Sequence, residues 1–338
     1  MREHVATTAS FSTFAPPAVL LEAVLPSWCE ELGDLQTAIP ALAKDAKRLA
    51  ELECAAAEIP TKHRIVRGDA RELHGVASNS VHLVLTSPPY WSLKKYRDSD
   101  GQMGHIEDYE EFLAELGNVW RRCFDVLVPG GRLICVVGDV CLSRRKNNGR
   151  HTVVPLHASI QEQCRTIGFD NLAPIIWNKI ANIAHEVDKG GGGFLGKPYE
   201  PNAVIKNDIE FILMERKPGG YRSPSNAARL LSVISDSDHK AWFTQIWTGL
   251  TGASTKQHPA PYPQTLADRL IRMFSFAGDT VLDPFSGTGT TTMAAIASGR
   301  NSIGYEIDDH YVTLARKRIQ KATNQLLSKA ELEVCEAC

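Results

Sequence analysis

The sequence predicts an α/β protein built around a doubly wound, mostly parallel β-sheet with helices on both faces. Short apolar or β-branched runs recur along the chain, and segments with helical spacing separate them. A length of 338 residues is sufficient for one large α/β domain with a smaller extension. Seven strands are expected, at residues 63–68, 80–86, 132–139, 172–179, 208–216, 279–284 and 301–306.

The expected helices carry apolar residues on one face. Residues 107–127 have such a stripe and end before Pro-Gly-Gly, and residues 262–276 repeat the pattern. Residues 1–60 are rich in Ala, Leu and Glu and are interrupted by prolines, which predicts an N-terminal extension of two or three helices. Residues 181–202 and 217–257 show no clear period, and long stretches of this kind are usually functional or disordered.

Composition restricts the class of protein. No apolar stretch approaches the about 20 residues of a membrane-spanning helix, and the N-terminal segment lacks the apolar core of a signal peptide. Eight scattered cysteines favour reduced thiols over a disulfide framework, so a cytoplasmic protein is expected. The final Cys-Glu-Ala-Cys has no second pair or histidine after it, and no metal site is predicted.

The charge of the chain does not indicate a general nucleic-acid binder, because its formal net value is −2. If DNA is the partner, the basic residues must gather on one face. The densest basic cluster includes Arg144, Arg145, Lys146 and Arg150. Two interpretations of this cluster stay open, a solvated loop and a surface that contacts phosphates.

The first motif that points to chemistry is Thr-Ser-Pro-Pro-Tyr-Trp, residues 86–91, where a predicted strand ends. A loop that only had to turn would use Gly, Asn or Asp. Two successive prolines instead fix the backbone and remove two N–H donors. The motif therefore predicts rigid acceptors beside an aromatic surface.

The second motif spans residues 279–292 and reads as a strand, Asp283, a loop with two glycines, and a helix that begins near Thr290. Glycines at such a turn let the backbone approach a ligand, and the helix N-terminus favours an anionic group. The Lys-Ser/Thr pair of a Walker loop and the third glycine of a dinucleotide fingerprint are both missing. A different nucleoside-like cofactor is favoured. Glu306 ends the next strand, where a carboxylate can accept hydrogen bonds from ribose hydroxyls or simply end the strand.

Together these motifs resemble the amino-methylating DNA methyltransferases, which use S-adenosylmethionine. Residues 87–90 match the catalytic tetrapeptide of that family, and residues 285–289 match its FxGxG cofactor loop. The catalytic motif comes first, as in the circularly permuted β group. Arg-Gly-Asp-Ala-Arg-Glu at 67–72 resembles the motif whose acid contacts the adenine, and residues 258–271 resemble the segment that helps enclose the methionine moiety. The resemblance covers most of residues 63–325 and implies a Rossmann-like methyltransferase fold.

The resemblance implies a division of the chain and of its functional residues. An N-terminal extension (1–60) precedes a catalytic half (61–216), a target-recognition region (217–257), a cofactor-binding half (258–325) and a C-terminal tail (326–338). Catalysis is assigned to Ser87, Pro88, Pro89 and Tyr90. Cofactor binding is assigned to Asp69, His258, Pro259, Asp283, Phe285, Ser286, Gly287, Gly289, Thr290 and Glu306. DNA contacts are expected from Trp91, Arg144, Arg145, Lys146, Arg150, Arg222 and Arg229.

The residue types fit methyl transfer to an exocyclic amino nitrogen. That nitrogen is a poor nucleophile because its lone pair is delocalised into the ring, so it needs acceptors for its N–H groups. Ser87 Oγ and the Pro88 carbonyl are the expected acceptors, and positioning supplies most of the rate. The target base must be flipped out of double-stranded DNA, and Tyr90 offers a stacking face. Trp91 is either a second wall or ordinary core packing.

Serine at the first position of the tetrapeptide resembles the cytosine-N4 enzymes, and adenine N6 is the alternative target. Methyltransferases acting on protein glutamine or structured RNA place the cofactor loop first, so the reversed order argues against them. An inactive DNA-binding module is a more distant alternative, which the two intact motifs disfavour. The resemblance also raises a cognate restriction endonuclease and a homodimer as partners.

Overall fold

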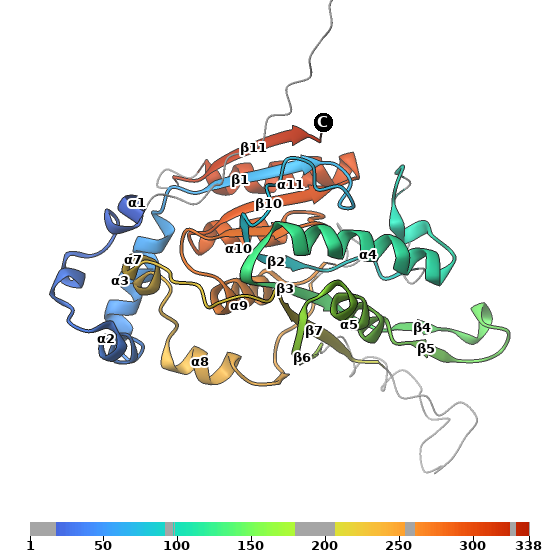
Figure 1. Cartoon of the computed structure of the whole chain (residues 1–338), viewed down its shortest axis with the longest axis horizontal. Helices are drawn as coiled ribbons and strands as arrows, with labels where there is room; N and C mark the ends of the chain where they lie inside the picture. Colours follow the sequence, from blue (N-terminus) through green and yellow to red (C-terminus); the bar gives the residue numbers. More distant parts are fainter. Residues whose placement is uncertain are drawn as a thin grey trace, which may run out of the picture.

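The computed structural model describes residues 18–91, 97, 99–179, 207–253, 261–324 and 329–337. Within them a nine-stranded sheet has the order β11-β1-β10-β9-β2-β3-β7-β6-β8, with helices on both faces (Figure 1). The strands are β1 (Lys62–Arg67), β2 (Val81–Thr86), β3 (Leu127–Val137), β6 (Asp170–Asn178), β7 (Ile209–Arg216), β8 (Ile246–Trp247), β9 (Thr280–Asp283), β10 (Asn301–Glu306) and β11 (Glu331–Glu336). Only β7 runs antiparallel to its neighbours in this sheet.

The α/β fold class and the seven expected strands are confirmed, but the count of seven is wrong. The two additional strands lie at the two edges of the sheet. β8 has two residues, too few for a period to be recognised in sequence. β11 comes from the expected C-terminal tail, where charged and apolar residues alternate, and its backbone pairs with β1 from Lys62 to Arg67.

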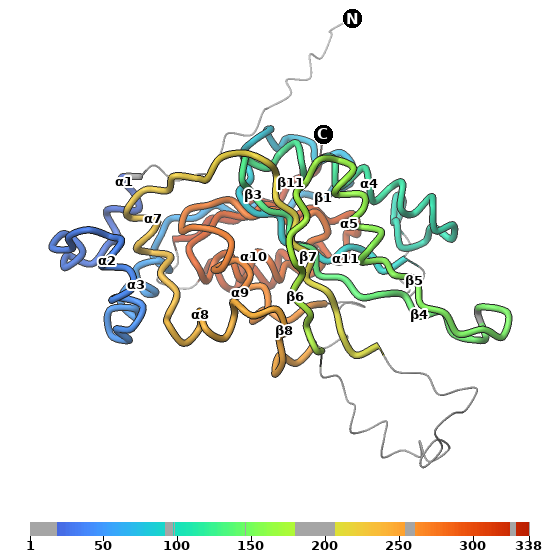
Figure 2. Tube along the Cα trace, turned by 60° about the horizontal axis from the view of Figure 1, so that its bottom comes forward, coloured from blue at the N-terminus to red at the C-terminus, as the bar shows by residue number. Residues whose placement is uncertain are grey.

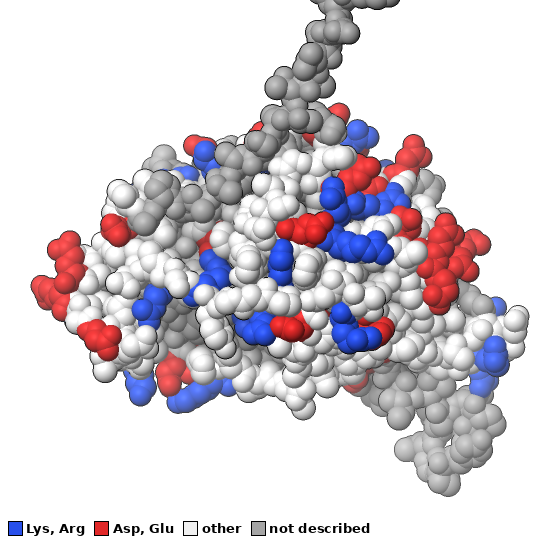
Figure 3. All heavy atoms as spheres, viewed as in Figure 1, with Lys and Arg blue, Asp and Glu red and all other residues white. Residues whose placement is uncertain are grey.

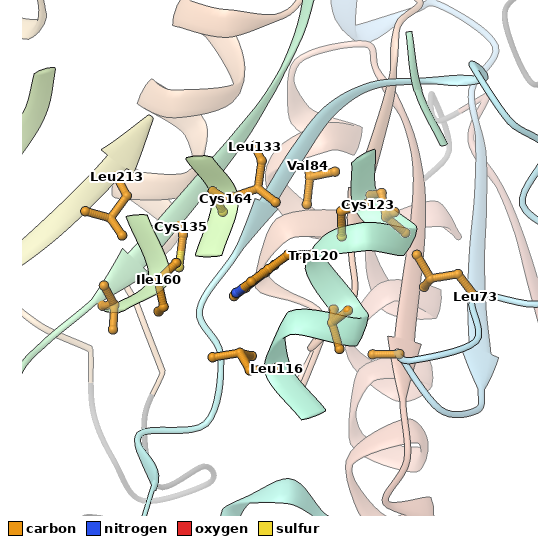
Figure 4. Close-up of a cluster of buried hydrophobic side chains, with 14 of the residues drawn as sticks. Leu73, Val84, Leu116, Trp120, Cys123, Leu133, Cys135, Ile160, Cys164 and Leu213 are labelled. Carbon is orange, nitrogen blue, oxygen red and sulfur yellow. The ribbon is translucent and has the colours of Figure 1, made fainter. Parts of the chain in front are cut away.

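Successive side chains along the central strands point to opposite faces of the sheet, so they pack in two separate hydrophobic cores. Val84 on β2 packs in the core beneath α4 (Tyr109–Val126) and α5 (Leu156–Ile167). Its neighbours Leu83 and Leu85 point to the opposite face, covered by α9 (Gln264–Phe274) and α10 (Thr290–Ala297). α11 (Asp309–Thr323) packs beside α10. Figure 4 shows the first core, where Trp120 of α4 reaches toward cysteines and leucines of the sheet and α5.

A group of short helices lies at the amino ends of the parallel strands, on the left of Figure 1. It comprises α1 (Ala18–Glu22), η1 (Ser27–Glu31), α2 (Leu35–Leu42), α3 (Ala46–Ala57), α7 (Asn226–Leu230) and α8 (Asp236–Trp242). The expected N-terminal helices thus form, and they share two apolar clusters with α7 and the turn after it. Much of the region expected to recognise the target sequence therefore packs against the N-terminal extension.

A separate antiparallel ribbon extends from the sheet at the carboxyl ends of the parallel strands. β4 (Val140–Leu142) and β5 (Thr152–Val154) pair with each other and with none of the strands described in the main sheet. They connect β3 to α5 and carry a 3-10 turn, η4 (Arg144–Lys146), near the tip. Figures 1 and 2 show this ribbon extending away from the body beyond the carboxyl ends of the strands. None of the described helices is long and apolar enough to cross a membrane.

Candidate active site at the carboxyl edge of the sheet

The two motifs meet in one pocket. β1, β10, β9 and β2 are neighbours in the sheet, so the residues that follow them lie at the same edge. Of the predicted site residues, Asp69, Ser87, Pro89, Phe285 and Glu306 all line this pocket. Sequence reasoning missed several apolar side chains that also line the pocket, among them Met103, Ile307 and Tyr311. They belong to no motif: Met103 begins the 3-10 helix η3 (Met103–His105), Ile307 follows β10 and Tyr311 lies in α11, and only the fold brings these segments to the pocket.

Glu306 ends β10 and presents an almost buried carboxylate, 9% exposed. Its Oε2 accepts a hydrogen bond from the Gly287 N–H at 2.9 Å, and its Oε1 accepts one from the Asp308 N–H at 2.9 Å. Burial raises the pKa of Glu306 to about 7, although these backbone bonds oppose the shift. The carboxylate therefore joins the glycine loop to the end of β10.

The glycine loop turns tightly between β9 and α10. Gly287 and Gly289 have positive φ angles of 50° and 78°. A Cβ at Gly289 would also lie 2.9 Å from Ile319 Cδ1, so the position excludes a side chain for two reasons. Ser286 donates its N–H to the Tyr305 carbonyl at 2.8 Å. Thr290 opens α10, and its Oγ1 accepts a hydrogen bond from Arg318 at 3.1 Å.

Asp283 lies beneath the loop, where it is 2% exposed. Its Oδ1 accepts hydrogen bonds from Thr86 Oγ1 at 2.7 Å and from the Phe285 N–H at 3.1 Å. Its Oδ2 accepts from the Tyr262 hydroxyl at 3.2 Å and from Thr291 Oγ1. Burial raises the pKa of Asp283, and these bonds lower it in part. The residue holds β2, β9 and α10 together and lies behind the pocket surface.

Asp69 follows β1 and faces the pocket with its carboxylate already paired. Arg71 Nε donates to both carboxylate oxygens at 2.9 Å. The same guanidinium bonds Glu115 of α4 at 2.6 Å. Asp69 is thus oriented by Arg71, whose second ion pair, with Glu115, connects the end of β1 to α4.

The Ser-Pro-Pro-Tyr segment begins where β2 ends. Ser87 is half-buried, and its Oγ lies 3.2 Å from the Tyr90 hydroxyl, while Pro88, Pro89 and Tyr90 are buried. Trp91 donates its Nε1–H to the Glu107 carbonyl at 3.1 Å, and its ring meets the Tyr109 ring edge-on at 5.0 Å. Trp91 therefore packs against the start of α4.

The predicted DNA contacts fall in two places. Arg144, Arg145 and Arg150 are exposed near the tip of the β4–β5 ribbon, and Lys146 belongs to the same turn. Figure 3 shows Lys and Arg side chains gathered at this tip, at the lower right of the molecule. Arg222 instead forms a two-pronged ion pair with Asp279, with one contact of 2.6 Å, at the start of β9. Arg229 lies in α7 at the same amino edge.

The structure therefore does not bring Arg222 or Arg229 to the pocket edge. The partner of Arg222 is 57 residues away in sequence, so no local pattern could reveal the ion pair. His258 and Pro259 lie outside the described residues.

Comparisons with known proteins identify the class to which this site belongs. A family model described as DNA methylase, of the N6/N4 type, matches residues 81–317. The type II methyltransferase M.MjaI of Methanocaldococcus jannaschii is 37% identical over 291 residues, covering 78% of this chain and 92% of that protein. The chain belongs to this family of DNA methyltransferases, whose targets are amino groups.

Solved structures and a further relative add to this finding. The structure of TTHA0409 from Thermus thermophilus, solved in complex with S-adenosyl-L-methionine, is 49% identical to this chain with a TM-score of 0.66. The match covers 82% of this chain and 99% of that one. The cytosine-N4-specific PvuII DNA methyltransferase has the same fold at 18% identity, with a TM-score of 0.54, over 82% of this chain and 95% of that one. The DNA adenine methyltransferase YhdJ of Escherichia coli is 28% identical, covering 77% of this chain and 83% of that protein.

Proposed function

We propose that the protein is a site-specific DNA methyltransferase that modifies the N4 amino group of a flipped-out cytosine in double-stranded DNA. The observation that carries the proposal is the shared pocket, in which Ser87 of the catalytic motif lines the same space as Glu306 and Phe285. Methyl transfer requires the acceptor nitrogen and the donor to lie within one such space.

S-adenosyl-L-methionine is the cofactor of this family, and when bound it supplies an electrophilic methyl group on a sulfonium. The residues present suit it. Ser286 Oγ is buried without a hydrogen-bond partner among the described atoms, and Glu306 offers a carboxylate for ribose hydroxyls. Asp69 would contact the adenine, and the loop from Phe285 to Thr290 would hold the remainder.

The acceptor nitrogen would be held by Ser87 and Pro88. Ser87 Oγ accepts one amino N–H and the Pro88 carbonyl accepts the other, which favours a pyramidal nitrogen with its lone pair directed at the methyl group. Pro89 keeps these acceptors fixed, because its ring restricts the backbone. Tyr90 supplies a stacking face for the extruded base, an interaction worth about 1–3 kcal/mol.

The choice of cytosine over adenine rests on Ser87 as the first residue of the tetrapeptide. Incubation of unmodified mixed-sequence DNA with cofactor, followed by nucleoside mass spectrometry, tests it. We expect N4-methylcytosine. Appearance of N6-methyladenine alone would establish the adenine alternative, and the absence of both products would leave the inactive DNA-binding module. Sequencing of the modified DNA would then give the recognition site.

Weaker S-adenosylmethionine binding is expected as the pH falls below 7. The ionised Glu306 carboxylate is the better acceptor for ribose hydroxyls, and its pKa is about 7. Each pH unit below that value therefore lowers affinity by up to about tenfold. Calorimetric titration between pH 8 and pH 5.5 would measure this. Glu306→Gln should bind more weakly and lose this part of the pH dependence; a variant with the wild-type profile would contradict the assignment.

The β4–β5 ribbon is proposed to contact DNA phosphates through Arg144, Arg145 and their neighbours. Arg144→Ala/Arg145→Ala should reduce the slope of log affinity against log salt concentration by about 2, since each phosphate contact contributes about 0.9. Fluorescence anisotropy with duplex DNA at several salt concentrations would measure it. Arg121→Ala/Arg165→Ala, which removes two exposed arginines of α4 and α5, is the matched control and should leave the slope unchanged. Equal slopes in both double variants would exclude the ribbon.

The names of the type II relatives support a restriction–modification setting with a cognate endonuclease. A cytoplasmic location is a separate proposal, which the eight scattered cysteines favour. A homodimer is a further proposal from the permuted-group resemblance. Size-exclusion chromatography with light scattering, with and without DNA, tests it.

A further inference from the structure

The carboxyl edge of the sheet divides into two halves. The pocket described above lies over β1, β10, β9 and β2. Beyond β2 come β3, β7 and β6, whose residues at this edge include Gly138 after β3, Glu210 near the start of β7 and Lys179 after β6. Because Ser87 and Tyr90 follow β2, this second half adjoins the catalytic motif on the side away from Glu306.

Glu210 lies close to the catalytic tyrosine across a glycine. A Cβ built on Gly138 would be 3.4 Å from Glu210 Cγ and 3.5 Å from Tyr90 Cε1. Gly138 therefore lies between the Tyr90 ring and the Glu210 side chain, at contact distance from both.

Several neighbouring residues fix the position of Lys179. Its Nζ bonds Glu210 Oε1 at 2.6 Å and lies 5.4 Å from the centre of the Trp177 ring. Its backbone N–H donates to the Asp208 carbonyl at 2.9 Å. A Cβ at Gly252 would come within 2.8 Å of Lys179 Cε, so the glycine leaves room for the lysine stem. The side chains of Lys179 and Glu210 are only 28% and 14% exposed.

We propose that Lys179, oriented by Glu210, donates a hydrogen bond to the acceptor edge of the flipped base; this inference rests on the proposed function. A base extruded from the duplex loses its pairing partner, and its ring nitrogen then needs a new donor. Cytosine and adenine both carry such a nitrogen beside the amino group, and cytosine also has O2. An ammonium has three N–H donors, and among the described residues only Glu210 accepts one from Lys179.

Base recognition fits this lysine better than phosphate contact. The Glu210 carboxylate beside it neutralises the charge and would repel a phosphate, whereas it helps to fix the direction of a donor toward a neutral base. The exposed arginines of the β4–β5 ribbon are placed more suitably for the DNA backbone. Lys179 is therefore assigned to the base and Glu210 is its positioning residue.

Lys179→Met keeps most of the stem and removes the donors. We expect kcat/KM for unmodified mixed-sequence DNA to fall about 10- to 100-fold, with an unchanged Kd for S-adenosylmethionine. The salt dependence of KM for DNA should stay as in the wild type, because no phosphate contact is lost. Lys329→Met is the control, since Lys329 forms an ion pair with Glu58 at 3.6 Å and lies before β11, outside the residues assigned to the cofactor or to DNA. This control variant should have the wild-type kcat/KM for DNA.

The positioning role of Glu210 is tested by combining its substitution with that of Lys179. Glu210→Gln alone should lower kcat/KM by a smaller factor, and the Lys179→Met/Glu210→Gln double variant should be no worse than Lys179→Met, because one residue acts through the other. The double variant also avoids an unpaired Glu210, so it separates misfolding from lost recognition.

Three results would overturn the inference. One is a wild-type kcat/KM in Lys179→Met, and another is a salt slope reduced by about 1, which would indicate a phosphate contact. The third is additive losses in the double variant. A wild-type protein that methylates neither base would instead refute the proposed function, and the assignment of Lys179 with it.

Discussion

Replacing Ser87 with alanine is expected to lower kcat at least about 100-fold, the usual effect of removing one acceptor or donor that acts on the transition state. Ser87 lines the same pocket as Glu306, but it follows β2, whereas Glu306 ends β10. Its loss removes an acceptor for the amino N–H while the glycine loop and its contacts stay intact. The Kd for S-adenosylmethionine should therefore change by less than about twofold, since binding and chemistry depend on different atoms.

Single-turnover methylation of mixed-sequence DNA measures the chemical step, and calorimetry measures cofactor affinity. Ser80→Ala is the control, because Ser80 precedes the same strand at its amino end and its hydroxyl donates to the Ala77 carbonyl, away from the pocket. It should have the wild-type rate. Turnover by Ser87→Ala at the wild-type rate would remove the acceptor role from Ser87.

Replacing Glu215 with glutamine is expected to stabilise the protein at pH 8. Glu215 lies within β7 and is fully buried. Burial raises its pKa from 4.5 to about 7, and the nearby Gln161 side chain opposes the shift. The folded state thus favours the protonated form: this contribution to stability is fully present below pH 4.5 and is lost as the pH rises to 7. The loss amounts to about 3 kcal/mol at pH 8.

Urea unfolding of the wild type and Glu215→Gln at pH 5 and pH 8 would test this. The variant should be more stable than the wild type at pH 8 by up to about 3 kcal/mol, and the difference should be smaller at pH 5. Glu306 has a similarly raised pKa and contributes its own pH dependence in both proteins. Glu162→Gln on the exposed face of α5 is the control and should follow the wild-type profile. A pH-independent difference would contradict the assignment.

The central strands and the pocket could be predicted because their signals are local. The two prolines after β2 indicate a rigid backbone there, and the two glycines after β9 indicate a tight turn. Both effects are local to a few residues. Since parallel strands end at a common edge, the two motifs could be expected to meet even though Ser87 and Gly287 are distant in sequence. In the structure, Ser87 of the first motif and Phe285 of the second line one pocket.

What sequence reasoning missed depends on long-range partners. The Arg222–Asp279 ion pair and the Lys179–Glu210 pair each join residues that are distant in sequence and that only the fold brings together. Lys179 follows a recognisable strand, but nothing nearby shows that Glu210 faces it. β11 is hard to predict because an edge strand with alternating charges buries little and is stabilised mainly by backbone pairing with β1.

The sheet order also has a consequence for synthesis on the ribosome. β1 is made early, yet its two neighbours, β10 and β11, are the last strands of the chain, and His63 of β1 lies 239 residues before its partner Ser302. β2 likewise waits for β9. Pairings of such high contact order form slowly, and until then the apolar faces of the early strands stay uncovered. We therefore expect the nascent chain to depend on chaperones, and the cofactor half of the site to assemble only after translation is nearly complete.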